Sequence, residues 1–139
     1  MRTIKFRGKK TINGSGQWVS GNYIHCELND YILPVHDNTV KSQVSYSVLP
    51  ETVGQFTGLL DKRGKEIFEG DIVKTGTDKL MEIGWREKFA SFVIERDGWV
   101  YSHYFGEAFY SEDCEVIGNI HDNPELIANT DTNAHVQPK

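Results

Sequence analysis

The sequence predicts a mainly β protein, in which a small, partly open barrel of the SH3-like kind follows an N-terminal β-meander. Three observations lead to this fold class. Short stretches alternate apolar and polar residues, which is the period-two pattern of half-buried strands. Turn-forming residues, mainly Gly, Asn and Asp, separate these stretches. No apolar run approaches the roughly 18 residues of a membrane span, and 139 residues suffice for one ordinary domain or two small ones.

Residues 1–53 form the predicted meander. Strands are expected at 2–8, 17–19, 23–28 and 31–35, with turns at 13–16, 21–22 and 29–30. Pro34 belongs at an edge or a bend, because it lacks the N–H group that a central strand donates. Residues 36–45 are polar and are expected to form an exposed loop, and residues 46–50 lead into the next region.

Residues 54–128 form the predicted barrel region. The apolar runs 56–60 and 67–73 flank a type I turn at 61–64, in which Asp61 bonds the following backbone and Gly64 takes a positive φ. A second bend at 69–71 leads into the barrel corner. Further strands are expected at 80–85, 89–95, 99–105 and 114–120, with a short helical turn within 106–113, where Ser111 suits a helix start, and another at 123–127. Residues 129–139 are polar and are expected to be a disordered tail.

The net charge of −5 is distributed unevenly along the chain. Basic residues crowd the first ten positions, whereas residues 97–138 hold eight acids and no Lys or Arg. The acidic total argues against a dedicated nucleic-acid binder. The N-terminus alternates too strictly for a signal peptide, so we expect a cytoplasmic protein with Cys26 and Cys114 as free, buried thiols.

The sequence contains no pattern that indicates catalysis, a cofactor or a metal. No His or Cys pair has a zinc-like spacing, and the adjacent His25 and Cys26 face opposite sides of a strand. No Ser lies in a nucleophile elbow, and Gly64 and Gly70 are far from any strand-to-helix transition that forms a phosphate loop. We therefore expect no catalytic, cofactor-binding or metal-binding residue, and no enzyme activity.

Two groups of residues are candidates for a partner surface. Nine aromatic residues lie between positions 85 and 110, and they either fill the core alone or also form an exposed patch. The candidates for that patch are Trp85, Trp99, Tyr101 and Tyr104. On the first strand, Lys5, Arg7 and Lys9 share one face, where they either contact nucleic acid or keep an edge strand soluble.

Three segments resemble the YopX family of phage and prophage proteins. They are IKFRGK with QWVSG near the start, FTGLLDKRGKEIFEGDIV at 56–73, and EVIGNIHDNPEL at 115–126. The resemblance spans nearly the whole chain. It implies a phage or prophage origin, a β-rich fold and no assigned activity, and it carries over no catalytic residue. The motif residues with structural roles are Gly58, Asp61, Gly64, Gly70 and Asp71.

Two functions remain open. The first is a phage or prophage accessory protein that acts as a non-enzymatic interaction module in the cytoplasm of a bacterial host, binding a protein partner or a second copy of itself. In that case the basic residues 1–10 can meet the acidic region 107–125 of the same or a neighbouring subunit. The alternative is a nucleic-acid-binding protein that uses the basic N-terminal strand. Neither function involves a membrane or a cofactor.

Overall fold

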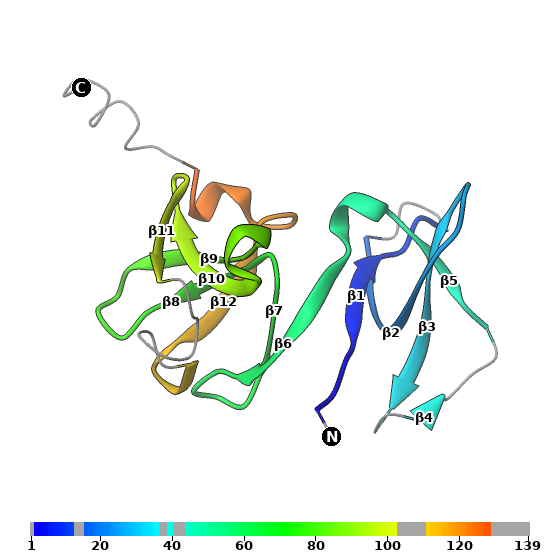
Figure 1. Cartoon of the computed structure of the whole chain (residues 1–139), viewed down its shortest axis with the longest axis horizontal. Helices are drawn as coiled ribbons and strands as arrows, with labels where there is room; N and C mark the ends of the chain where they lie inside the picture. Colours follow the sequence, from blue (N-terminus) through cyan, green and yellow to red (C-terminus); the bar gives the residue numbers. More distant parts are fainter. Residues whose placement is uncertain (1, 13–15, 37–38, 41–43, 103–110, 129–139) are drawn as a thin grey trace. The chain divides into compact units, whose positions relative to one another are not determined.

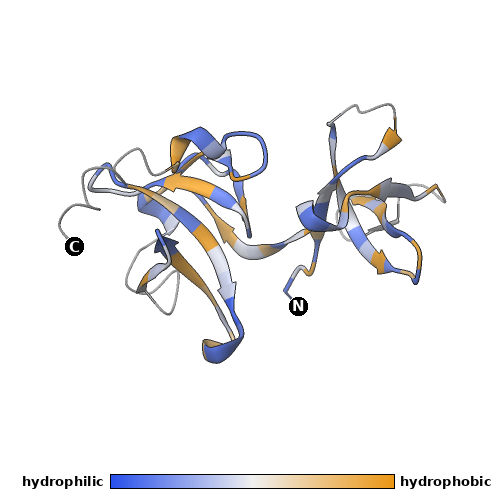
Figure 2. Ribbon diagram, turned by 90° about the horizontal axis from the view of Figure 1, so that it is seen from above, coloured by the Kyte–Doolittle hydropathy of each residue, from blue (hydrophilic) through white to orange (hydrophobic). Residues whose placement is uncertain are grey.

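The chain folds into two compact units, Met1–Gly58 and Leu59–Lys139 (Figure 1). The computed structural model describes residues 2–12, 16–36, 39–40, 44–102 and 111–128. Within them the protein is mainly β, as the sequence predicts, with only short 3₁₀ turns between strands. Figure 2 shows hydrophobic and hydrophilic segments alternating along these strands.

Unit 1 is built on an antiparallel sheet with the strand order β4-β3-β2-β1-β6, and β5 also pairs with β3. Its elements are β1 (Phe6–Lys9), β2 (Trp18–His25), β3 (Asp30–His36), β4 (Thr39–Val40), β5 (Tyr46–Val48), the 3₁₀ turn η2 (Pro50–Thr52) and the start of β6 (Gly54–Leu60). The bridge between Lys10 and Val48 ties β5 back to the end of β1. The chain is thus paired with β5 at the residue that follows β1, 38 positions before Val48, as well as with the hairpin partner β2 along β1 itself.

The predicted turn at residues 21–22 is wrong, because β2 runs without a break from Trp18 to His25. Gly21 makes this possible. It has a φ of +156°, and a Cβ atom there would overlap the backbone carbonyl of Leu33 on the neighbouring strand β3. Glycine is needed here for a close approach between two strands, and not for a reversal of the chain.

The centre of unit 1 is small. Ile32 on β3 and Val48 on β5 are fully buried, and the rings of Phe6 and Tyr23 lie 5.4 Å apart. Gly8 lets β1 approach this centre, since an added Cβ would lie 3.0 Å from the Cβ of Val48. β1 therefore has an inner face, with Phe6 and Gly8, and an outer face that carries its basic side chains.

Unit 2 is built on a second antiparallel sheet, with the strand order β11-β10-β9-β8-β12. Its elements are β7 (Glu66–Phe68), which pairs with β6, then β8 (Asp71–Lys74), β9 (Leu80–Arg86), η3 (Glu87–Phe89), β10 (Ser91–Arg96), β11 (Trp99–Ser102), η4 (Ser111–Asp113), β12 (Glu115–Asn119) and η5 (Pro124–Leu126). The two predicted helical turns are present as η4 and η5, and residues 106–110 of the first predicted segment lie outside the described residues.

The motif at 56–73 forms the two predicted bends. Gly64 has a φ of +84° and its N–H donates to the carbonyl of Asp61 at 2.9 Å, which closes the first turn. Gly70, at φ +92°, lies in the second bend between β7 and β8. There the carboxylate of Asp71 accepts a hydrogen bond from the N–H of Phe68 at 2.7 Å.

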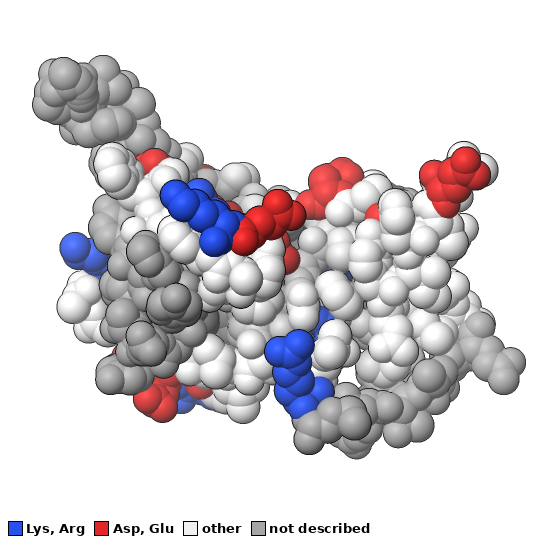
Figure 3. All heavy atoms as spheres, in the orientation of Figure 1, with Lys and Arg blue, Asp and Glu red and all other residues white. Residues whose placement is uncertain are grey.

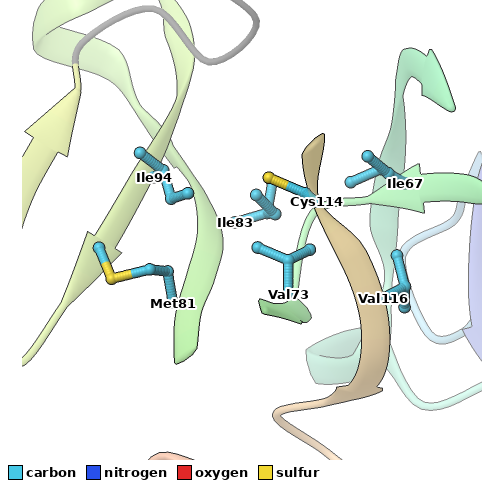
Figure 4. Close-up of a cluster of buried hydrophobic side chains, with 7 residues drawn as sticks. All are labelled: Ile67, Val73, Met81, Ile83, Ile94, Cys114 and Val116. Carbon is cyan, nitrogen blue, oxygen red and sulfur yellow. The ribbon is translucent and has the colours of Figure 1, made fainter. Parts of the chain in front are cut away.

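The core of unit 2 fills one face of its sheet (Figure 4). It consists of the buried side chains Ile67, Val73, Met81, Ile83, Ile94, Cys114 and Val116. Ile72 and Val93 are also fully buried although they alternate with core residues, so the middle strands are covered on both faces. This double burial is why consecutive residues of β8 and β10 are apolar.

Several expectations end differently or stay untested. Neither sheet closes into a barrel within the described residues, and the SH3-like likeness stays a prediction. The division between units falls inside β6, whereas the sequence places a boundary before residue 54. Cys114 is buried as expected, but Cys26 is exposed in the turn after β2. Residues 103–105 of the predicted strand 99–105 and the predicted tail lie outside the described residues.

Candidate functional site

The connection between β9 and β10 carries an exposed aromatic pair. Trp85 lies directly opposite Phe92 in the ladder, and their rings meet edge to face with centroids 5.1 Å apart. The residues one step further along the same face, Ile83 and Ile94, are fully buried in the core. Trp85, by contrast, is 43% exposed. The apolar face of the sheet therefore continues outward, past the core, onto this end of the hairpin.

The tip that follows is a tight structure with charges of both signs. The 3₁₀ turn η3 ends at Ala90, which has the left-handed conformation with φ +49° and closes the turn by donating its N–H to Glu87. A non-glycine residue at this φ is uncommon, so the surrounding contacts hold the tip in place. Glu87 and Lys88 are exposed, and the Lys88 ammonium lies 5.8 Å from the ring centroid of Phe89. We call Trp85, Phe92 and residues 87–89 the hairpin end.

The predicted aromatic patch is only partly assembled. Trp99 is 73% exposed, but it pairs with Arg96, four residues along β10 from Phe92. At about 3.3 Å per residue, Trp99 therefore lies on the order of 13 Å along the strand from Trp85. Tyr101 lies on β11, although its side chain is outside the described structure, and Tyr104 is outside the described residues.

The predicted basic residues do share one face, in unit 1. Arg7 lies over the Trp18 ring, with its guanidinium carbon 4.6 Å from the centroid, and Lys9 approaches the same ring at 5.9 Å. Lys5 lies 5.4 Å from the centroid of the Phe56 ring. The Arg7 atoms Nε and Nη2 are buried, so this side chain packs as well as carrying charge. These cation–π contacts cover faces of the Trp18 and Phe56 rings on which a nucleobase would have to stack.

Two clusters of titratable groups were missed by the sequence reasoning. On β9 and β10, Glu82 and Glu95 lie directly opposite each other, and Arg86 forms an ion pair with Glu95. Burial, and then the charge of Glu95, raises the pKa of Glu82. Gly84 leaves room for this arrangement, since an added Cβ would overlap the Glu95 carboxylate. Only the register of the hairpin, which no local pattern reveals, brings the two acids together.

The second cluster joins β2 and β3. The Tyr23 hydroxyl donates to Asp30 Oδ2 at 2.6 Å, and the His25 Nδ1 atom lies 2.7 Å from Asp30 Oδ1. The hydrogen bond from Tyr23, followed by the one from His25, lowers the pKa of Asp30, and the same bond raises the pKa of Tyr23 to about 12. All three residues lie at the closed end of one hairpin, so the cluster fixes the register of β2 against β3.

The acidic region near the C-terminus is partly engaged inside unit 2. Glu115 forms ion pairs with Arg63 at 3.4 Å and with Lys62 at 3.7 Å. Glu115 is thus engaged within unit 2, whereas the expectation that the acidic region 107–125 meets the basic residues 1–10 stays a prediction. On the face drawn in Figure 3, Lys and Arg side chains lie among Asp and Glu side chains, without a broad patch of one sign.

The cysteine and metal chemistry of the described residues is limited. Burial, followed by the charges of Asp113 and Asp61, raises the pKa of the Cys114 thiol to about 11, and a thiol in this state is a poor nucleophile. No group of three His, Cys, Asp or Glu side chains in the described part of the chain is arranged to hold a metal ion. Among these residues, no helix has the length and apolarity to cross a bilayer.

The fold and surface of the described residues together define a small two-sheet β protein with a partly exposed aromatic pair at the β9–β10 hairpin end. The sequence matches the family model described as YopX protein over residues 2–128, and the chain belongs to the YopX family. A search among curated proteins finds no match.

A solved structure supports the fold. The crystal structure of protein EF1440 from Enterococcus faecalis is similar with a TM-score of 0.56 and 24% sequence identity. The match covers 92% of this chain and 100% of that chain. This likeness concerns the fold alone.

Proposed function

We propose that this YopX-family chain is a non-enzymatic interaction module, a phage or prophage accessory protein that works in the bacterial cytoplasm by binding another protein chain. One observation carries the proposal: the apolar stripe of β9 and β10 continues from the buried Ile83 and Ile94 to the half-exposed Trp85. An aromatic side chain that a core could have covered, but leaves exposed, is typical of an interface residue.

The absence of enzyme activity is part of the proposal. The buried cysteine has a raised pKa, and the two clusters of titratable groups have structural partners that account for their positions. Glu82 and Glu95 face each other across one ladder, with Arg86 neutralising Glu95. The hydrogen bonds of Asp30 with Tyr23 and His25 join β2 to β3 at the turn end of their hairpin.

The proposal is tested with the full chain and two tryptophan variants. Size-exclusion chromatography with light scattering measures self-association, and affinity capture from a bacterial host lysate detects other partners. We expect Trp85→Ala to weaken whichever interaction is found by about 30-fold, the effect of losing a hot-spot residue of about 2 kcal/mol. Trp99→Ala is the matched control, since it removes a more exposed tryptophan at the far end of the same sheet. A protein that stays monomeric and captures nothing rejects the proposal.

A second candidate function is nucleic-acid binding, favoured by one observation: Lys5, Arg7 and Lys9 lie on one face of unit 1 beside Trp18 and Phe56. Unit 1 has six Lys and Arg residues and four Asp and Glu residues, which gives a net charge of +2. Unit 2 has nine Lys and Arg residues and sixteen Asp and Glu residues, which gives a net charge of −7. Retention on single-stranded DNA or RNA at about 50 mM salt, lost steeply as salt rises, supports this function. No retention at that salt rejects it.

A further inference from the structure

The charges of the hairpin end indicate what kind of partner it fits. Arg86, just before the tip, is paired with Glu95, so its charge is already compensated inside unit 2. Among the described residues of the hairpin end, the exposed charges are Glu87 and Lys88, one of each sign on adjacent residues. A strongly acidic or strongly basic partner gains nothing from such a neutral pair. A surface that carries both signs side by side can match itself.

A two-fold axis turns this neutrality into complementarity. In an isologous contact, residue i of one copy meets residue j of the other, and residue j meets residue i. Near an axis at the tip, Glu87 of each copy therefore faces Lys88 of the other, which forms two ion pairs by symmetry. The aromatic pair of each copy lies next to these charges and supplies the apolar part of the contact.

One edge of the same sheet, formed by β12, is partly occupied by another segment of the chain. The carbonyl of Cys114, just before β12, accepts a hydrogen bond from the N–H of Lys62, and the N–H of Val116 on β12 donates to the Asp61 carboxylate. The turn at 61–64 thus occupies part of this edge, so a partner strand cannot extend the sheet along its whole length. The hairpin end lies at the ends of the central strands β9 and β10, which pair with each other, so a contact there is made by side chains.

We infer that the partner of the hairpin end is a second copy of this chain, docked about a two-fold axis that passes near Glu87 and Lys88. This inference rests on the proposed function. Trp85 and Phe92 form the apolar part of the contact. The tip is already held by the left-handed Ala90, so docking costs little ordering of the backbone.

Charge exchange at two exposed positions tests the inference without touching the core. Glu87→Lys places two like-charged pairs across the axis, and so does Lys88→Glu. Because an exposed ion pair is worth at most about 1 kcal/mol and two pairs are reversed, we expect each variant alone to weaken self-association about tenfold or more. Mixing the two variants restores both pairs, so a heterodimer is expected, and the double variant Glu87→Lys/Lys88→Glu is expected to dimerise like the wild type.

The measurement is light scattering after size exclusion over a dilution series, with one variant tagged to identify heterodimers and circular dichroism to verify folding. Glu112→Lys, at an exposed site on η4, is the control for a general change of net charge. A wild-type dimer that is indifferent to both charge exchanges overturns the two-fold contact and leaves the interaction module standing. A wild-type monomer that captures a host protein through Trp85 also overturns the two-fold contact and supports the interaction module. A monomer that captures nothing rejects both proposals.

Discussion

Asp61 shows how a single side chain of the family motif holds unit 2 together. Its Oδ1 atom accepts hydrogen bonds from the N–H groups of Arg63 and Lys65, both at 2.8 Å, which fixes the turn. Its Oδ2 atom accepts one from Val116 at 2.9 Å, which joins the turn to β12. Sequence reasoning predicts the first of these roles. The second joins residues 55 positions apart and follows only from the fold.

Replacing Asp61 by Ala is therefore expected to destabilise the protein by about 3 kcal/mol, because three backbone donors lose a charged acceptor. The midpoint of urea unfolding measures this. Asp78→Asn is the control, since Asp78 is exposed and its positive φ suits Asn equally well. A midpoint for Asp61→Ala within error of the wild type contradicts the role.

The same contacts make this contribution depend on pH. Burial opposes ionisation, but the N–H groups of Val116, Lys65 and Arg63 together hold the pKa of Asp61 below its ordinary value. The stabilisation is therefore present above the ordinary aspartate pKa and is lost as the pH falls through the lowered pKa of the folded state. The difference in unfolding free energy between the wild type and Asp61→Asn, measured by urea unfolding at several pH values, should therefore decrease below about pH 4.

Gly64 gives a prediction about backbone strain alone. An added Cβ at Gly64 meets no atom within 4 Å, so any cost of substitution comes from the φ of +84°. Gly64→Val is expected to cost about 1–3 kcal/mol, and Gly64→Asn clearly less, because Asn tolerates the left-handed conformation. Chemical unfolding of both variants provides the comparison, and equal stabilities would show that strain is not the cause.

Among the elements, the β9–β10 hairpin combines the core, the acid pair and the exposed aromatic end. Met81 and Ile83 occupy alternate positions of β9, within the predicted strand 80–85, and both are buried. The intervening positions look like a polar face, but Glu82 is half-buried opposite Glu95. Alternation reveals which residues share a face, whereas the packing of other chain segments decides whether that face is exposed.

Glu82→Gln is expected to stabilise the protein at neutral pH. Burial and the charge of Glu95 raise the pKa of Glu82, so the folded state binds the proton more tightly than the unfolded state. Protonated Glu82 therefore contributes to the stability of the folded state below the ordinary glutamate pKa. This contribution is lost as the pH rises through the raised pKa of Glu82 in the folded state. The midpoint of thermal unfolding, measured at pH 7 and pH 4, tests this. We expect the midpoint of Glu82→Gln to lie above that of the wild type at pH 7 and close to it at pH 4. The control is the exposed Glu112→Gln.

For the whole molecule, the division into two units predicts separate responses to core truncation. Ile32 lies at the centre of unit 1 and Ile83 in the core of unit 2, and both are fully buried. Each change to Ala is expected to cost about 2–5 kcal/mol. Hydrogen exchange should show lost protection mainly in residues 1–58 for Ile32→Ala and mainly in 59–128 for Ile83→Ala. Equal loss throughout the chain in both variants indicates one cooperative unit.

The sequence by itself determined the β class, most strand positions, the two glycine bends and the family. These depend on local properties: side-chain alternation, the φ freedom of Gly64 and Gly70, and turn chemistry around Asp61. It failed at Gly21, where a glycine signals the close approach of β3 instead of a turn. At that position the deciding atom belongs to a residue twelve positions away.

Only the tertiary structure decided the rest. It separated Trp85 from Trp99 along the sheet and placed Glu82 against Glu95. It also covered the ring of Trp18 with Arg7 and left Trp85 exposed while Ile83 is buried. The physical reason is the same in each case. Exposure and pairing depend on strand register and on which segments pack together, and those contacts join residues that are distant in the chain.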